Sequence, residues 1–264
     1  YFSGQYYVLD ISQGGIINSV VFPCPDEHGF KGILVAPTVH GNLIVGPDAY
    51  QVEDGDHVAT VEPYLSQVKS GGLRSVPGID FRQTIHEYAG VRPNTQIPDF
   101  VIEESPICPH FINLAGIKSP GLSAAPAIAL EGLRILSGCG LELTEKETFI
   151  DRRRRIKFRE LSNAEKAAVI AEDPLYGRVI CRCETVTEGE IVEAIHRPIV
   201  PRSIDAIKRR CNAGMGRCQG GFCGPRVHEI LARELGVSPM DITMDEEGTW
   251  LLSSPIKEVS VHDA

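Results

Sequence analysis

The sequence CRCETVTEGEI at residues 181–191, followed by GMGRCQGGFCGP at 214–225, places four cysteines in two close pairs. The pairs are Cys181 with Cys183 and Cys218 with Cys223. Four thiolates in this arrangement are a ligand set for a metal ion or an iron–sulfur cluster. Glycines beside both pairs let backbone N–H groups turn toward sulfur, and nearby arginines offset thiolate charge. We therefore predict a metal or cluster site in the last third of the chain.

The other bulk properties describe an ordinary globular protein. The chain has 264 residues, 42% hydrophobic and 23% charged, which is enough for about two domains. A net charge of −9 argues against nucleic acid as the main partner. No apolar run approaches the roughly 18 residues of a membrane span, and no signal peptide is recognised. We expect a reducing, cytoplasmic location, with attachment to the inner face of a membrane only through a partner.

The cysteine distribution supports metal binding over disulfide formation. Five of the eight cysteines lie between residues 181 and 223. Clustered cysteines in a chain of this size, without secretory features, more often bind metal than form bridges. We expect the remaining four to be ordinary thiols: Cys24, Cys108, Cys139 and Cys211.

Sequence periodicity predicts an α+β chain, with a β-rich first part followed by a small, mainly helical domain. Short β-branched or aromatic runs predict strands at 6–11, 16–22, 31–37, 42–45, 81–92, 100–104 and 110–115. Helices are predicted at 58–75, 124–136, 162–171, 188–196, 203–210 and 225–235. Two of these follow capping-box sequences, Ser162 with Glu165 and Thr187 with Glu190. The arginine-rich run at 152–159 is expected to be a solvated connector or an interdomain face.

Zinc and an iron–sulfur cluster are both compatible with the four cysteines. Structural zinc sites favour C-x2–4-C in both halves, and C-x-C is less usual there. The cysteine spacing and the sequence around it resemble the bacterioferritin-associated ferredoxin type of [2Fe-2S] domain. The likeness is closer still to that domain at the C-terminus of the anaerobic, FAD-dependent glycerol-3-phosphate dehydrogenase large subunits. It implies that Cys181, Cys183, Cys218 and Cys223 hold a [2Fe-2S] cluster.

Three upstream segments resemble the same family, within the wider group of flavoproteins like D-amino-acid oxidase. They are PTVHGNLIVGP at 37–47, YAGVRP at 88–93 and AGIKSPGLSAAP at 115–126. The resemblance divides the chain into part of an antiparallel substrate domain (1–97), the last segment of an FAD-binding domain (98–137), a connector (138–176) and the [2Fe-2S] domain with its tail (177–264).

The resemblance also implies roles for particular residues. The loop and helix start that would lie beside the flavin ring contribute Gly116, Ile117, Lys118, Gly121, Leu122 and Ser123. Backbone N–H groups there would stabilise negative charge on reduced flavin. Arg92 is expected to grip an anionic substrate group with its planar fork. His40, as base or substrate contact, and Lys118 are further catalytic candidates.

One expected motif is missing. A flavoprotein of this group should contain a strand followed by G-x-G-x-x-G for the FAD pyrophosphate, and this sequence has none in that context. We therefore expect the C-terminal part of such an enzyme, inactive by itself, with FAD bound mostly by a region outside this chain.

The sequence leaves several functions open. The favoured one oxidises sn-glycerol 3-phosphate and passes electrons through flavin and the cluster to an acceptor subunit or a quinone-linked partner. A 2-hydroxy acid resembling L-2-hydroxyglutarate, or an amino acid, is the alternative small anionic substrate. A different class of function is a non-enzymatic iron–sulfur or zinc-binding module.

Overall fold

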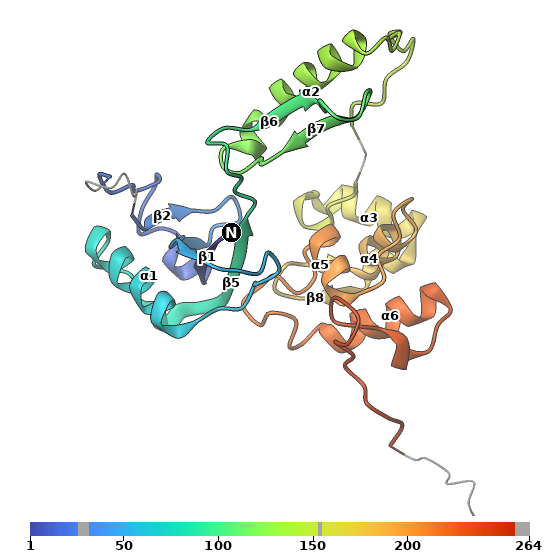
Figure 1. The fold of residues 1–264 in the computed structure, drawn as a ribbon. Coiled ribbons are helices and arrows are strands. Elements are labelled where there is room, and N and C mark those ends of the chain that lie inside the picture. Colours follow the sequence, from blue (N-terminus) through green and yellow to red (C-terminus); the bar gives the residue numbers. More distant parts are fainter. Residues whose placement is uncertain (26–31, 153–154, 257–264) are drawn as a thin grey trace, which may run out of the picture. The chain divides into compact units, whose positions relative to one another are not determined.

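The chain divides into two compact units, residues 1–150 and 151–264. The computed structural model describes residues 1–25, 32–152 and 155–256 (Figure 1). The segments 1–97 and 98–137, expected as parts of two domains, lie in the same unit. Among the described residues, no helix is both long and apolar enough to cross a membrane.

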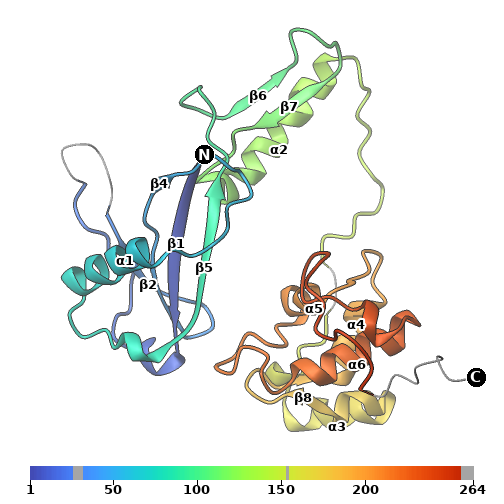
Figure 2. The same cartoon turned by 60° about the horizontal axis from the view of Figure 1, so that its bottom comes forward.

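The first unit is organised around β1 (Phe2–Leu9), the centre of an antiparallel five-stranded sheet. On one side, β1 pairs along its whole length with β5 (Thr84–Arg92), and Figure 2 shows these two strands side by side. On the other side, it pairs first with β4 (Tyr50–Gln51) and then with β3 (Leu43–Gly46). The outer strand β2 (Leu34–Pro37) pairs with β3.

The core of this unit covers one face of the sheet. Helix α1 (Glu62–Ser75) lies there and buries Leu65 and Val68. The fully buried apolar side chains of this core are Leu9, Val35, Leu43, Val45 and Val68. Because side chains alternate along a strand, every second side chain of β1 and β5 faces away from α1 and lies on the opposite face of the sheet, outside this core.

Three predictions for this unit need correction. No strand forms over 16–22; only Val21 makes an isolated bridge, to Val35. Ile17 and Val21 pack against the core, but Val20 and Phe22 are 55% and 53% exposed, and a single bridge does not make a strand. The helix predicted from residue 58 begins at Glu62, with Pro63 in its first turn, where proline is tolerated. The strand predicted from Phe81 begins at Thr84, after a short 3-10 turn.

A hairpin and a helix complete the first unit. Strands β6 (Val101–Glu104) and β7 (Ile112–Ala115) pair antiparallel and contact α2 (Gly121–Gly138), as Figure 1 shows in green. The two strands agree with the prediction to within two residues, and α2 starts three residues before the predicted helix. Two apolar residues of α2, Leu122 and Leu130, are 94% and 69% exposed.

The second unit is a small helical domain. Its helices are α3 (Asn163–Glu172), α4 (Glu188–Ile195), α5 (Ile204–Cys211) and α6 (Gly224–Leu235), in agreement with the predictions. Strands β8 (Val179–Cys181) and β9 (Val186–Thr187) form a short hairpin before α4. Ile191, Ile207 and Leu231 are fully buried at the centre.

Short 3-10 turns occur in both units. They span Ile11–Gln13, Phe81–Gln83, Phe158–Glu160, Pro174–Gly177 and Pro239–Asp241.

Both predicted capping boxes form. The contacts of the second box show that part of the expected connector belongs to the second unit. Glu190 is buried and accepts hydrogen bonds from the backbone N–H of Thr187 (2.8 Å) and of Phe158 (3.2 Å). Phe158 and Tyr176 are themselves buried against this unit. Residues 158–177 are therefore part of the second unit rather than a connector. Arg153 and Arg154 of the basic run lie outside the described residues, while Arg159 pairs with Glu184 at 3.0 Å.

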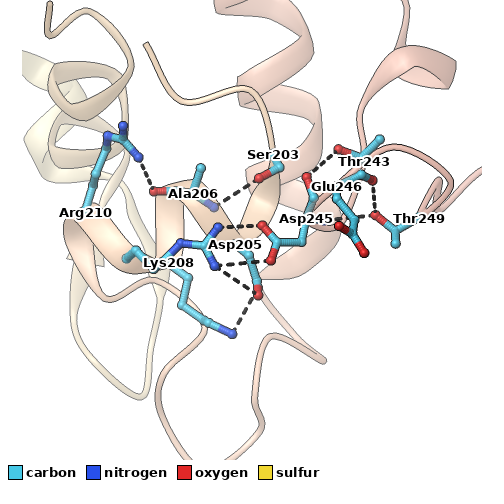
Figure 3. A network of polar contacts seen from close by, with 10 residues as sticks. Ser203, Asp205, Ala206, Lys208, Arg210, Thr243, Asp245, Glu246 and Thr249 are labelled. Atoms are coloured by element: carbon cyan, nitrogen blue, oxygen red, sulfur yellow. Dashed lines mark hydrogen bonds and ion pairs between the residues drawn. The ribbon is translucent and has the colours of Figure 1, made fainter. Parts of the chain in front are cut away.

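The end of the described chain is anchored on α5 (Figure 3). Thr243 forms a parallel bridge with Ser203, and Asp205 donates its backbone N–H to the Met244 carbonyl (2.8 Å). Arg209 pairs with Asp245, which lowers the pKa of that carboxyl. These contacts fix the segment that carries the single tryptophan of the sequence, Trp250.

Candidate cofactor and substrate sites

The structure brings the four predicted thiols together as an inner and an outer pair. Cys181 ends β8 and Cys223 immediately precedes α6; they are 1% and 2% exposed, and their thiols hydrogen-bond to each other. Cys183 and Cys218 are exposed, with their sulfurs 3.8 Å apart. The pairing therefore runs across the two loops rather than within each sequence motif.

This spacing fits a thiolate-bound metal centre. Two sulfurs on one tetrahedral metal, with bonds of about 2.3 Å, lie about 3.8 Å apart. The separation of Cys183 from Cys218 has that value. The donor set of four thiols, half buried in a helical core and half open to solvent, suits a [2Fe-2S] cluster with one exposed edge. The inner pair would hold it against the core, and the outer pair would form the edge.

Hydrogen bonds and burial shift the pKa values of the four thiols in both directions. The hydrogen bond from Cys223 is the main cause that lowers the pKa of Cys181 to about 6, and the backbone N–H groups of Gly214 and Glu184 assist. The N–H of Phe222 is the main cause that lowers the pKa of Cys218. The pKa of Cys223 is raised, mainly by its hydrogen bond to Cys181, and burial raises the pKa of Cys183. Metal binding requires thiolates and would therefore displace the protons of these two thiols.

The fifth cysteine of the cluster region behaves differently. Burial raises the pKa of Cys211 to about 11, and its thiol hydrogen-bonds the Ile207 carbonyl within α5. A protonated, inward-facing thiol of this kind is a packing residue.

Gly216 shapes the outer pair by allowing close contact. A Cβ built on Gly216 would lie 2.2 Å from the Cβ of Cys183. Real atoms cannot approach so closely, so any side chain at 216 must displace the cysteine. The glycine content of the loop therefore has a steric as well as a conformational reason.

Arg92 lies on the sheet face opposite α1. The register pairs Phe2 with Arg92, Gly4 with Gly90 and Tyr6 with Tyr88. The guanidinium lies over Gly4 and donates 3.0 Å hydrogen bonds to the carbonyls of Ser3 and Asp48. A guanidinium has five N–H donors, so this anchoring leaves it able to bind an anion.

Two tyrosines that sequence reasoning missed share this face. The rings of Tyr6 and Tyr88 stack with centroids 4.9 Å apart. Burial raises the pKa of Tyr88 to about 12 and also raises that of Tyr6, so both phenols are protonated hydrogen-bonding groups at neutral pH. The strand alternation was visible in the sequence, but only the register brings these rings to the face that carries Arg92.

His40 lies far from Arg92. It is exposed in the β2–β3 turn, next to the Leu9 end of β1, whereas Arg92 pairs with Phe2 at the other end. At about 3.3 Å per residue, the length of β1 separates them by roughly 20 Å. The structure therefore does not bring His40 and Arg92 to one small substrate.

The predicted flavin loop joins β7 to α2. Gly116 has a φ of +63°, and the Lys118 carbonyl accepts from the N–H of Gly121 (2.7 Å). Leu122 and Ser123 are exposed in the first turn of an 18-residue helix, where N–H groups lack partners within the helix. Such a turn can donate to a polar or anionic ring edge, as the flavin assignment requires. Lys118 is half-buried in the loop itself.

Family comparisons define the class of each unit. Residues 2–131 match the family model "FAD dependent oxidoreductase", and residues 179–233 match "BFD-like [2Fe-2S] binding domain". The chain thus combines part of an FAD-dependent oxidoreductase domain with a [2Fe-2S]-binding domain, as the sequence predicted.

The individual relatives include glycerol 3-phosphate dehydrogenases and a glycerophosphate oxidase. The chain is 50% identical to glycerol 3-phosphate dehydrogenase of Caloramator mitchellensis over 255 residues, which is 96% of this chain and 53% of that protein. It is 38% identical to one subunit of the anaerobic glycerol-3-phosphate dehydrogenase of Escherichia coli over 66 residues, 25% of this chain and 12% of that protein. Among solved structures, FAD-bound L-alpha-glycerophosphate oxidase of Mycoplasma pneumoniae matches with 34% identity and a TM-score of 0.49, covering 56% of this chain and 38% of that one. The chain therefore spans about half the length of the Caloramator relative.

Proposed function

We propose that this chain is the part of an FAD-dependent sn-glycerol 3-phosphate oxidoreductase that binds the substrate and transfers electrons onward. When bound, the flavin accepts the substrate's hydride and a [2Fe-2S] cluster carries single electrons onward. The observation that carries the proposal is the inner and outer pair of thiols in a [2Fe-2S]-binding domain, on a chain half identical to a glycerol 3-phosphate dehydrogenase.

Each set of residues has a distinct task in this proposal. Arg92, fixed on two backbone carbonyls, binds the phosphate of the substrate, and the neighbouring face of Tyr6 and Tyr88 shields it from water. The segment 116–123 donates backbone N–H groups to the flavin ring. Cys181 and Cys223 anchor the cluster, while the exposed Cys183 and Cys218 form the edge nearest to an acceptor.

The acceptor is proposed to be a second protein of the same complex or a quinone-linked partner. An exposed cluster edge supports transfer to another molecule, because electron transfer requires close approach. The Escherichia coli relative is named as one subunit of its enzyme, which supports an assembly of several chains. The location would be cytoplasmic, with any membrane attachment made through the partner.

The cluster assignment is tested by anaerobic reconstitution of the chain with iron and sulfide. We expect about two irons per chain and visible absorption typical of a [2Fe-2S] centre. Serine at position 181, 183, 218 or 223 should remove or alter that absorption, whereas Cys211→Ser should leave it unchanged. A colourless protein that binds only zinc would contradict the proposal.

The substrate assignment needs the full-length enzyme. Arg92→Ala should raise the KM for glycerol 3-phosphate by about 10- to 100-fold, the loss of a charge-assisted hydrogen-bonded pair, and Arg92→Lys should recover part of it. Arg82, 89% exposed and paired with Asp80, provides the matched control in Arg82→Ala. A normal KM in Arg92→Ala, or a higher kcat/KM for L-2-hydroxyglutarate than for glycerol 3-phosphate, would reject this assignment.

A further inference from the structure

A second group of metal-binding side chains lies in the first unit, outside the sites described above. Glu104 is the last residue of β6, His110 lies in the β6–β7 loop, and Cys139 caps the C-terminus of α2. Their ligand atoms (a carboxylate oxygen, an imidazole nitrogen and a thiol sulfur) all lie within 4.8 Å of one another. Three elements of the fold thus supply three different donor types to one place.

Local structure holds these side chains near one another. The backbone N–H of His110 donates to the Glu104 carboxylate at 2.7 Å, which returns the loop to the end of β6. The N–H of Ser105 donates to the Phe111 carbonyl at 2.7 Å and closes the same loop. Cys139 is held by its N–H bond to Ile135 (2.9 Å), and its thiol hydrogen-bonds Glu104. The arrangement is therefore set by backbone contacts rather than by the ligand side chains alone.

The donor chemistry selects a class of ion. Thiolate, imidazole and carboxylate together are typical of zinc, whereas calcium and magnesium take oxygen ligands. Tetrahedral bonds of about 2.0–2.3 Å would bring the donor atoms within about 3.3–3.8 Å of one another. Two of the side chains are exposed and the third is half-buried, so rotamer changes can supply a contraction of this size.

We propose that Glu104, His110 and Cys139 form a binding site for a zinc-class divalent ion, with water as the remaining ligand. Bound metal replaces the proton of the Cys139 thiol and joins the β6–β7 loop to the end of α2. The other end of α2 begins at the predicted flavin loop, so the ion would steady the element that carries that loop. The site is independent of the four-cysteine centre and of the substrate assignment.

The test uses the 264-residue chain with its iron–sulfur centre already loaded, so that the four-cysteine site is occupied. The chain is incubated anaerobically with excess zinc, desalted, and analysed for iron and zinc. We expect one zinc per chain with unchanged iron. X-ray absorption at the zinc edge should show one sulfur at about 2.3 Å and nitrogen or oxygen ligands at about 2.0 Å.

Variants connect the bound zinc to these residues. Cys139→Ser and His110→Ala should each weaken zinc binding by at least about tenfold, as loss of a ligand does. Cys24→Ser removes another exposed thiol of the same unit and should bind zinc like the unaltered chain. The proposal is overturned if the loaded chain retains no zinc, if the zinc has four sulfur ligands, or if both ligand variants bind it normally. Should the variants fail to fold, the zinc content and sulfur count of the unaltered chain still decide.

Discussion

At the scale of single residues, the four-cysteine site depends on the missing side chain of Gly216 as well as on the cysteines themselves. Gly216 faces Cys183 so closely that a Cβ would lie 2.2 Å away. The outer thiol pair reaches its 3.8 Å separation only because this space is empty. A steric requirement of this kind cannot be met by a small adjustment, since Cys183 is tied to the β8–β9 turn.

Gly216→Ala should therefore displace Cys183 and remove most of the cluster. The expected result is a large loss of bound iron and visible absorption after reconstitution, with an overpacking cost of about 1–3 kcal/mol. Gly224 is the matched control, because nothing lies within 4 Å of a Cβ at that position. Equal iron content in Gly216→Ala and Gly224→Ala would show that the contact does not matter.

At the scale of elements, the two capping boxes of the second unit share the pattern S/T-x-x-E, but one is exposed and the other is buried. The Ser162–Glu165 box starts α3 at the surface, where Glu165 bonds the N–H of Ser162. In the Thr187–Glu190 box, Glu190 is buried and also accepts from Phe158. Only the second box joins two parts of the chain.

Glu190→Ala should thus destabilise the second unit more than Glu165→Ala does. Two buried N–H groups lose their acceptor, at about 1–3 kcal/mol each, against about 0.5–1 kcal/mol for the exposed box. Denaturant unfolding of the cluster-free chain, followed by Trp250 fluorescence, measures both variants in the same unit. Equal losses would mean that burial of Glu190 contributes nothing.

The contact of α1 with its sheet gives a second prediction at this scale. A Cβ on Gly72 would lie 2.6 Å from a methyl group of Val45. Although alanine favours helix by about 1 kcal/mol over glycine, overpacking costs about 1–3 kcal/mol. Gly72→Ala should lower the free energy of unfolding of the first unit, measured by far-UV circular dichroism.

Gly138→Ala, in the last turn of α2 with nothing within 4 Å of the added Cβ, should leave that stability unchanged or raise it. A stabilised Gly72→Ala variant would contradict the close packing of α1 on the sheet.

At the scale of the whole molecule, two compact units with separate cores should respond separately to the cluster. The single tryptophan, Trp250, lies in the second unit, so its fluorescence reports that unit alone. Loading the four-cysteine site should raise the midpoint of the fluorescence transition by several degrees, because the ligand binds only the folded form.

Loading the cluster should not change the unfolding midpoint of the first unit. Its unfolding, observed as a second transition in circular dichroism, should keep the same midpoint with and without the cluster. A common shift of both transitions would indicate that the two units unfold as one.

The sequence by itself determined the elements and chemistry that depend on short-range pattern. The helices of the second unit, both capping boxes and the α+β class follow from residue spacing and local motifs, because capping and amphipathic burial act over three or four residues. The two cofactor-domain classes came instead from the resemblance of longer segments to known families. The strand predicted at 16–22 was wrong because β-branched residues favour extended backbone, whereas a strand also needs a neighbouring strand, and within this run only Val21 forms a bridge.

Only the tertiary structure decided which residues meet. Strand register puts Tyr6 and Tyr88 on the face of Arg92 and leaves His40 at the far end of β1. Packing of the two loops pairs Cys181 with Cys223 and Cys183 with Cys218, across motifs that look like separate pairs in the sequence. Folding of the β6–β7 loop against α2 joins Cys139, one of the expected ordinary thiols, to Glu104 and His110. These contacts join segments that lie far apart in the sequence, where register and packing, rather than local propensity, fix the distance.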